Sequence, residues 1–300
     1  MSKETNMDND MLSYAQNMED VVLAQLFEGQ KTGFYIDVGG GHAIADNVSF
    51  LFYEQGWSGI VVEPQSNLGG LYKQIRPRDV LISALAGRTE GTLELFEATV
   101  FHGLSTASVE HAVAAEKAGV AGQRVSKPVT TLAKLCADHA PAEINFLKID
   151  VEGHEAEVLA GNDWTRFRPQ VVLVEAIEPL TMLDASHRFE PLIVSNGYRF
   201  AFFDNLNRWY VADESAATLM PRFPQACLPW DSVKHLGEYG PAHTDVQHPD
   251  HALAKKLVAA FLAVLPGLSA DIYAQLDAKP QDMKALARIA SLFDGGYLTD

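Results

Sequence analysis

Short runs of apolar residues recur along the first two thirds of the chain, and several are separated by polar stretches with helical spacing. Nearly continuous apolar runs of this length are typical of strands buried on both faces, as in parallel sheets. The expected strands are FYIDV (34–38), GIVVE (59–63), DVLISAL (79–85), INFLKIDV (144–151) and QVVLVEA (170–176). The expected helices cover 46–56, 66–75, 130–140 and 152–161. This alternation predicts an α/β fold with a mostly parallel, doubly wound sheet.

The pattern changes after this region. YRFAFFD (198–204) and RWYVAD (208–213) are separated by Asn205, Leu206 and Asn207, which predicts an antiparallel hairpin at the end of the sheet. Residues 217–250 have little periodicity, and helical spacing returns from His251. We therefore divide the chain into an N-terminal segment (1–32), an α/β domain (33–214) and a C-terminal extension, first irregular and then helical (215–300). Its helices are expected to form a cap or an interface, and an interface could join copies into a homo-oligomer.

Composition narrows the function classes. Hydrophobic residues make up 47% of the 300 residues, enough for a packed core. The net charge of −16 would repel nucleic-acid phosphates, which disfavours a nucleic-acid substrate and favours a neutral or weakly charged small molecule. No apolar run approaches the ~18 residues of a membrane span, and the polar start MSKETNMDND does not resemble a secretory signal, so we expect a cytoplasmic protein. Cys136 and Cys227 are expected to be reduced thiols.

The candidate cofactor site begins with Asp37 and the three glycines that follow Val38. Glycines allow the chain to turn sharply and to approach a ligand closely, because no Cβ obstructs it. Asp37 comes at the carboxyl end of a strand, where ligands bind in open α/β sheets, and it could hold an ammonium group or an ordered water. A glycine turn with only a structural role is the alternative.

A second acidic residue follows about 20 residues after the glycines, where a carboxylate accepts hydrogen bonds from the ribose hydroxyls of an adenosine. This residue is Glu63, at the end of the next strand. Nicotinamide enzymes also bind the ribose with a carboxylate at this position. Their binding turn, however, needs a third glycine where this chain has Ile44 and small residues where it has His42. S-adenosylmethionine has no pyrophosphate and is therefore the favoured cofactor.

From about Ser13 to Glu214 the chain resembles the FkbM-type methyltransferases. The matching segments are SYAQNMEDVVL (13–23), GFYIDVGGGHAIADNVS (33–49), YEQGWSGIVVEP (53–64), GLSTAS (103–108), FLKIDVEGHEAEVLAG (146–161) and LNRWYVADE (206–214). The resemblance implies a class I methyltransferase, Rossmann-like fold, whose sheet ends in a hairpin. It also implies S-adenosylmethionine as the donor and a hydroxyl acceptor, often on a sugar or polyketide, in glycan or secondary-metabolite biosynthesis.

The resemblance also implies roles for single residues. Asp37, Gly39 and Gly41 match the cofactor loop and Glu63 the ribose-binding acid, although Gly40 and Gly41 depart from its usual residues. Met18 stands where the family usually has Gly. The resemblance assigns four further residues to the cofactor site: Gln16, Glu19, Asn47 and Pro64, with Asp20 nearby. It assigns Asn207 and Arg208 to the acceptor site.

Lys148, Asp150 and Glu152 alternate at the end of the fourth strand, and a period of two places them on one side. We interpret Lys148 and Asp150 as catalytic, Asp150 also as cofactor-binding, and Glu152 as acceptor-binding. The alternative is a Lys148–Asp150 ion pair, with Glu152 interacting with a helix dipole. His154 is the candidate general base, with a solvated surface histidine as its alternative. His102 is a second candidate base.

Asp150, Glu175 and Glu178 are expected at adjacent strand ends and could bind Mg²⁺ or Ca²⁺ through oxygen ligands. Nothing in their spacing demands a metal, and Glu175 has the alternative of lining the acceptor pocket. We therefore expect no metal ligand, with a divalent cation as the less favoured possibility. His243, His248 and His251 do not have a zinc-binding spacing.

Two other function classes stay open at this point. A nicotinamide-dependent oxidoreductase could use a similar sheet, although Ile44 and the terminal hairpin argue against it. A non-catalytic scaffold could retain a relict cofactor site, although the intact set of Asp37, Gly39–Gly41 and Glu63 argues against that reading.

Overall fold

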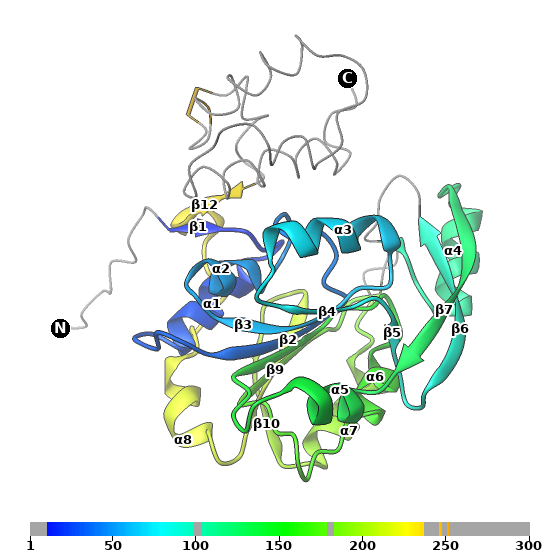
Figure 1. The fold of residues 1–300 in the computed structure, drawn as a ribbon. Coiled ribbons are helices and arrows are strands. Elements are labelled where there is room, and N and C mark those ends of the chain that lie inside the picture. Colours follow the sequence, from blue (N-terminus) through cyan, green and yellow to red (C-terminus); the bar gives the residue numbers. More distant parts are fainter. Residues whose placement is uncertain (1–10, 99–103, 179–182, 237–245, 248–250, 252–300) are drawn as a thin grey trace, which may run out of the picture.

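The computed structural model describes residues 11–98, 104–178, 183–236, 246–247 and 251. Its centre is a 7-stranded sheet (Figure 1). The order across the sheet is β10 (Tyr198–Phe203), β11 (Asn207–Ala212), β9 (Val171–Glu175), β8 (Phe146–Ile149), β2 (Phe34–Val38), β3 (Ser58–Val62) and β4 (Val80–Ile82). β11 runs in the opposite direction to the other six strands of this sheet. The predicted mostly parallel sheet with a terminal hairpin is confirmed.

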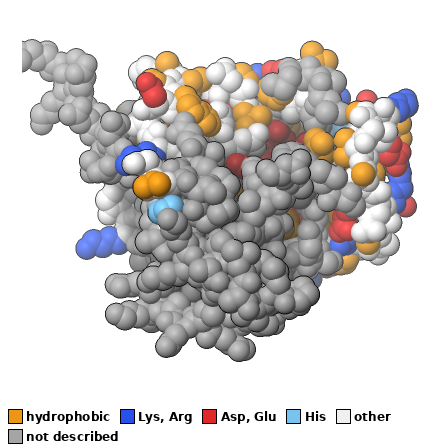
Figure 2. Space-filling view, turned by 90° about the horizontal axis from the view of Figure 1, so that it is seen from above, with side chains coloured by type: hydrophobic (Ala, Val, Ile, Leu, Met, Phe, Trp, Pro, Cys, Tyr) orange, Lys and Arg blue, Asp and Glu red, His pale blue; other side chains and the backbone are white. Residues whose placement is uncertain are grey.

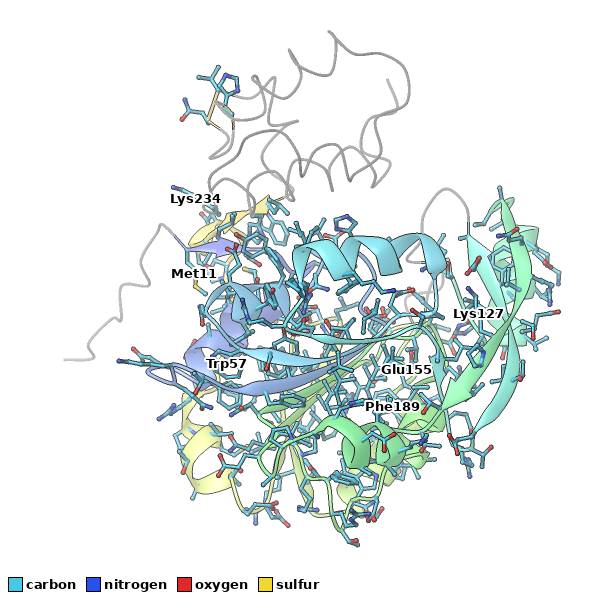
Figure 3. The ribbon with its side chains drawn as sticks, viewed as in Figure 1. Met11, Trp57, Lys127, Glu155, Phe189 and Lys234 are labelled. Atoms are coloured by element: carbon cyan, nitrogen blue, oxygen red, sulfur yellow. The ribbon has the colours of Figure 1, made fainter. Side chains whose placement is uncertain are left out.

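Helices cover both faces of the sheet, because successive side chains of a buried strand point to opposite faces. Tyr35 and Ile36 of β2 belong to different hydrophobic clusters, one on each side. Trp57 and Phe189, labelled in Figure 3, are buried in these two clusters. The first cluster is covered by α1 (Glu19–Leu26), α2 (Phe50–Glu54), α3 (Ser66–Ile75) and α8 (Ala216–Leu219), the second by α5 (Leu132–His139), α6 (Glu155–Ala160) and α7 (Glu190–Val194).

A second, 3-stranded sheet projects from the side of the molecule (Figure 1). Its long antiparallel strands, β6 (Gly91–Ala98) and β7 (Gly122–Thr130), flank α4 (Val109–Lys117), and β5 (Leu85–Ala86) pairs with β7. We call residues 91–130 the β6–β7 excursion. The apolar pattern did not predict it, because the first four residues of β6 are exposed and the strand buries too few side chains to produce a buried run.

Three predicted boundaries are wrong. The run at 79–85 is divided between β4 and β5, because the amide of Ala84 donates to the carbonyl of Ile82 and turns the chain. The helix expected at 46–56 covers only α2, since Asp46 has a left-handed φ of 50°. The helix expected from residue 152 begins at Glu155, because Glu152 and Gly153 both have positive φ.

The ends of the described chain meet at a short parallel pair, β1 (Leu12–Ser13) with β12 (Lys234–His235). The region predicted to be irregular contains α8 and two 3₁₀ turns, η3 (Met220–Arg222) and η4 (Trp230–Ser232); η2 (Ser186–Arg188) precedes α7. The helices predicted after His251 lie outside the described residues.

A buried arginine connects α3 to the turn after β2. The Arg76 guanidinium is fully buried and pairs with Asp79 at 2.8 Å. It also donates to Ser49 Oγ at 2.7 Å, Asn47 Oδ1 at 2.9 Å and Tyr35 OH at 3.1 Å. A buried charge with this many partners supports the structure only as long as the whole network is complete.

We expect Arg76→Met to lower the free energy of unfolding by about 3–5 kcal/mol, because Asp79 becomes a buried, unpaired charge. Urea denaturation measures this change. Arg88→Met is the matched control, since Arg88 pairs with Glu157 at the surface, with 58% and 42% of the side chains exposed. An exposed pair of this kind contributes little to stability. Equal losses in the two variants would contradict a structural role for the Arg76 network.

Candidate functional site

The turn after β2 can be built only from glycine at two of its positions. Gly39 has a φ of 75°, and a Cβ there would lie 1.7 Å from the carbonyl oxygen of Asp150. A Cβ on Gly40 would lie 2.4 Å from Cγ1 of Val61. The turn therefore packs directly against the end of β8, and its backbone is open to a ligand on the other side.

Glu63 and Asn47 hold this turn in place. Glu63 Oε2 accepts from the amide of Gly41 at 2.8 Å, and Oε1 accepts from the amide of Gln65 at 2.8 Å. The amide group of Asn47 donates to the carbonyls of Gly40 at 2.8 Å and His42 at 3.0 Å. Burial raises the pKa of Glu63 to about 7. Each Glu63 oxygen retains a lone pair for a further donor.

Lys148 lies beneath the glycine turn. Its Nζ donates to the carbonyl of Gly39 at 2.7 Å and lies 3.4 Å from one carboxylate oxygen each of Asp37 and Asp150. Burial opposes the charged ammonium, but the attraction of Asp150 and then Asp37 outweighs it, so the pKa of Lys148 lies above its ordinary value. The Lys148–Asp150 ion pair proposed as the structural alternative is therefore present.

A cavity of about 440 Å³ lies over the carboxyl ends of β2, β3, β8 and β9. This size suits a small-molecule site. Its walls are formed by residues of the glycine turn and β3 (Gly39, Gly40, Gly41, Glu63 and Pro64), by the strand ends of β8 and β9 (Lys148, Asp150, Glu152, His154, Glu175 and Glu178) and by Gln16. Figure 2 shows acidic side chains in a hollow of the face seen from above, beside hydrophobic ones.

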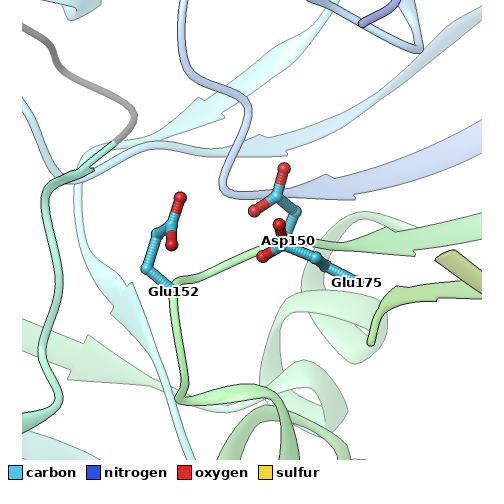
Figure 4. Close-up of side chains that lie close together, drawn as sticks. All are labelled: Asp150, Glu152 and Glu175. Carbon is cyan, nitrogen blue, oxygen red and sulfur yellow. The ribbon is translucent and has the colours of Figure 1, made fainter. Parts of the chain in front are cut away.

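Three carboxylates meet on one wall of this cavity (Figure 4). Asp150, Glu152 and Glu175 each bring an oxygen within 4.8 Å of the other two. Burial, followed by the charge of Asp150, raises the pKa of Glu152 to about 9 and that of Glu175 well above its ordinary value. Carboxylates this close cannot all ionise at neutral pH, so the group shares protons or takes up a cation.

The set of possible metal ligands differs from the predicted one. Glu178 was expected beside Asp150 and Glu175, but it forms an ion pair with Arg188, and Glu152 takes its place. The reason is the positive φ of 54° at Glu152, which keeps this residue out of α6 and next to the strand ends.

His154 is half-buried at the start of α6 and lines the cavity. Burial lowers its pKa below 6.5. A histidine with a lowered pKa is neutral at pH 7 and can accept a proton, as a general base must. This half-buried position on the cavity wall favours the interpretation as a general base over that of a solvated surface residue.

Several predicted site residues lie away from the cavity. Asp37 is fully buried and accepts from Ser49 Oγ at 2.6 Å, and Asn47 lies behind the turn. Asn207 donates to Glu19 Oε1 at 2.7 Å, so both side chains are used in a buried contact between β11 and α1. Arg208 points to the other side of β11, where it pairs with Asp184 and Glu190.

The aromatic pair of the hairpin is part of the core. Trp209 and Tyr210 are buried in clusters on opposite faces of the sheet, and neither lines the cavity. His102 and the histidines at 243 and 248 lie outside the described residues. Among the described part of the chain, the wall also includes residues that we did not predict, from the β6–β7 excursion (Leu95, Leu104, Ser105 and Ala107) and next to Glu63 (Gln65). Only the GLSTAS segment of the resemblance pointed to any of them.

Residues 37–200 match the family model of the methyltransferase FkbM domain. This match covers more than half of the chain and includes the glycine turn, Glu63 and the three-carboxylate wall. No curated protein matches the chain. Among the described residues, no helix has the length and apolar character needed to cross a bilayer.

We expect Glu152→Gln to stabilise the protein increasingly as the pH rises from 4.5 to about 9. The folded-state pKa of Glu152 is about 9 and its ordinary value is 4.5, so ionisation costs folding free energy across this window. Glutamine stays neutral and avoids the cost. Urea denaturation at several pH values, for the variant and the wild type, measures the difference.

Glu157→Gln is the control with the opposite sign. A hydrogen bond from Arg88 lowers the pKa of Glu157, so its carboxylate contributes stability above the ordinary pKa that is lost as the pH falls. That variant should be slightly less stable than the wild type at neutral pH. If the free energy of unfolding of Glu152→Gln changes with pH in parallel with that of the wild type, Glu152 is not buried among like charges.

Proposed function

The chain belongs to the FkbM methyltransferase family, and we propose that it transfers a methyl group from S-adenosylmethionine to a hydroxyl of a sugar, glycan or secondary metabolite. One observation carries the proposal. One cavity is lined both by the glycine turn with the buried Glu63 and by His154 with the three-carboxylate wall. The first group could bind the ribose of the donor, and the second could act on the acceptor.

The residues present fit the proposed donor. Gly39, Gly40 and Gly41 line the cavity with backbone alone, and Glu63 has a lone pair free on each oxygen for the ribose hydroxyls. Gln16 and Pro64 complete this end of the cavity. The donor carries an ammonium and a sulfonium, and the excess of carboxylates near Asp150 is complementary to this charge.

When bound, S-adenosylmethionine supplies an electrophilic methyl group. Lys148 and Asp150 keep the ends of β2 and β8 together. The donor and acceptor ends of the cavity therefore keep a constant position relative to each other. Orientation of this kind supplies about 7–11 kcal/mol in well-aligned reactions. His154 accepts the proton of the acceptor hydroxyl at an imidazole nitrogen, because burial keeps the ring neutral.

The charge of the cavity indicates the acceptor class. Glu152, Glu175 and Glu178 line it, and Lys148 is already paired with two carboxylates. The wall offers no unpaired cation among the described residues to a phosphorylated or carboxylated acceptor, whereas its protonated and ionised carboxyls can donate hydrogen bonds to a neutral polyol and accept them from it. The proposed acceptor is therefore a neutral hydroxylated molecule.

Ile44 disfavours a nicotinamide-dependent oxidoreductase. Its side chain is fully buried in the hydrophobic core, at the position where a dinucleotide site requires a third glycine. A scaffold with a relict site would have no reason to retain the buried Glu63 against the cost of desolvation.

Glu63→Ala should weaken S-adenosylmethionine binding by about 1.5–3 kcal/mol, the scale of a charged hydrogen bond. Isothermal titration calorimetry measures the affinity, with Glu110→Ala on the exposed face of α4 as the control. Unchanged donor affinity in the Glu63 variant, or tight NADH binding to the native protein, contradicts the proposed cofactor.

His154→Ala should lower kcat by about 10²–10⁴-fold while donor affinity is unchanged. The assay follows transfer of a labelled methyl group to a panel of neutral sugars and polyols. In the native protein, activity should fall on the acid side, below pH 6.5, because protonated His154 cannot act as a base. The pH–rate profile of His154→Ala should lack this fall on the acid side.

His139→Ala, in the exposed part of α5, is the matched control and should behave as the wild type. If His154→Ala turns over normally at every pH, another group removes the proton, and His102 is the next residue to substitute.

A further inference from the structure

Glu152 has an unusual backbone conformation at the edge of the cavity. Its φ is 54°, in the left-handed region that residues with a side chain rarely adopt. Its Oε2 is buried and has no hydrogen-bond partner among the described residues. A residue is held in this region only when its surroundings determine it, and such residues occur mainly at functional sites.

Two side chains of the β6–β7 excursion hold the carbonyl oxygen of Glu152. Thr106 Oγ1 donates to it at 2.7 Å, and His111 Nδ1 lies 2.8 Å from it. Because a carbonyl oxygen only accepts, the His111 Nδ1 carries the proton. Both residues are distant from Glu152 in the sequence, by 46 and 41 positions.

The neighbouring peptide groups are held from the other side. Glu155 Oε1 accepts from the amides of Val151 at 3.3 Å and Gly153 at 3.0 Å. Gly153 has a φ of 95°, and a Cβ on it would lie 2.2 Å from the His111 ring. The turn is thus clamped between α6 and the excursion, which leaves the Glu152 side chain next to Asp150 and Glu175.

Thr106 is itself well anchored. Its backbone exchanges hydrogen bonds with Phe96 of β6, at 2.9 and 3.0 Å, and its hydroxyl accepts from the amide of Ser108 at 2.9 Å. Ser108 caps α4, the helix that carries His111. The two donors therefore belong to one hydrogen-bonded unit, and both contact the carbonyl oxygen of Glu152.

We propose that Thr106 and His111 are positioning residues, which hold Glu152 in its left-handed conformation so that its carboxylate faces the acceptor end of the cavity. The excursion then has a function in the reaction beyond covering the site. The proposal rests on the proposed function for the identity of the acceptor, but the contacts that carry it exist in the protein alone.

The first test needs neither donor nor acceptor. Thr106→Val keeps the shape of the side chain and removes the hydroxyl, whereas Thr106→Ser keeps the hydroxyl. The carboxyl group of Glu152 is titrated by ¹³C NMR, with Glu152→Gln for assignment. The groups that affect this titration are Asp150, Glu155, Lys148 and Glu175.

In Thr106→Val we expect the apparent pKa of Glu152 to fall by about one unit or more toward 4.5, because the side chain gains access to solvent. Thr106→Ser should titrate as the wild type. His111→Phe should act as Thr106→Val does, and it replaces that variant should Thr106→Val fail to fold. Thr92→Val, on the exposed part of β6, is the matched control.

The second test is a double-mutant cycle on methyl transfer. Thr106→Val should lower kcat about tenfold, the effect of one net hydrogen bond of the stronger kind, with unchanged donor affinity. In a Glu152→Ala background the same substitution should have no further effect on kcat.

A wild-type titration curve in both Thr106→Val and His111→Phe overturns the proposal, as does an equal kcat loss with and without the Glu152 carboxylate. Failure of the native protein to bind S-adenosylmethionine would refute the proposed function and would leave the NMR result to decide the positioning role.

Discussion

The ammonium of Lys148 holds together the carboxyl ends of the two central strands. It donates to the carbonyl of Gly39 after β2, and it pairs with Asp37 and Asp150 on either side. A buried charge is tolerated only when it is fully compensated, so this group requires all three partners. The close contact between Gly39 and the Asp150 carbonyl follows from the same approach of β2 to β8. The floor of the cavity therefore depends on this interaction.

The charges above this floor are not balanced in the same way. Glu152 and Glu175 have no cation of their own among the described residues, and burial and the charge of Asp150 raise the pKa of both. A wall that holds protonated and ionised carboxyls together both donates and accepts hydrogen bonds. Such a wall suits hydroxyl groups, and the net charge of −16 gives the protein no general attraction for anionic acceptors.

Local patterns were sufficient for the parts that local physics determines. The bounds of β2 and α3 agree with the predicted ones, because a buried run and an amphipathic stretch are properties of neighbouring residues. The roles of Asn207 and Arg208 could not be found in this way. They are adjacent in β11, so their side chains point to opposite faces, and each is used by a partner distant in sequence, Glu19 and Asp184 respectively.

The sequence by itself determined the α/β alternation, the glycine turn with Glu63, and the family to which the chain belongs, because each depends on residue type and spacing along the chain. The tertiary structure decided which carboxylates meet. Glu152 replaces Glu178 beside Asp150 and Glu175 because Thr106 and His111, from an excursion with almost no apolar pattern, hold its carbonyl oxygen. A backbone conformation imposed by contacts across more than 40 residues leaves no signal in the neighbouring sequence.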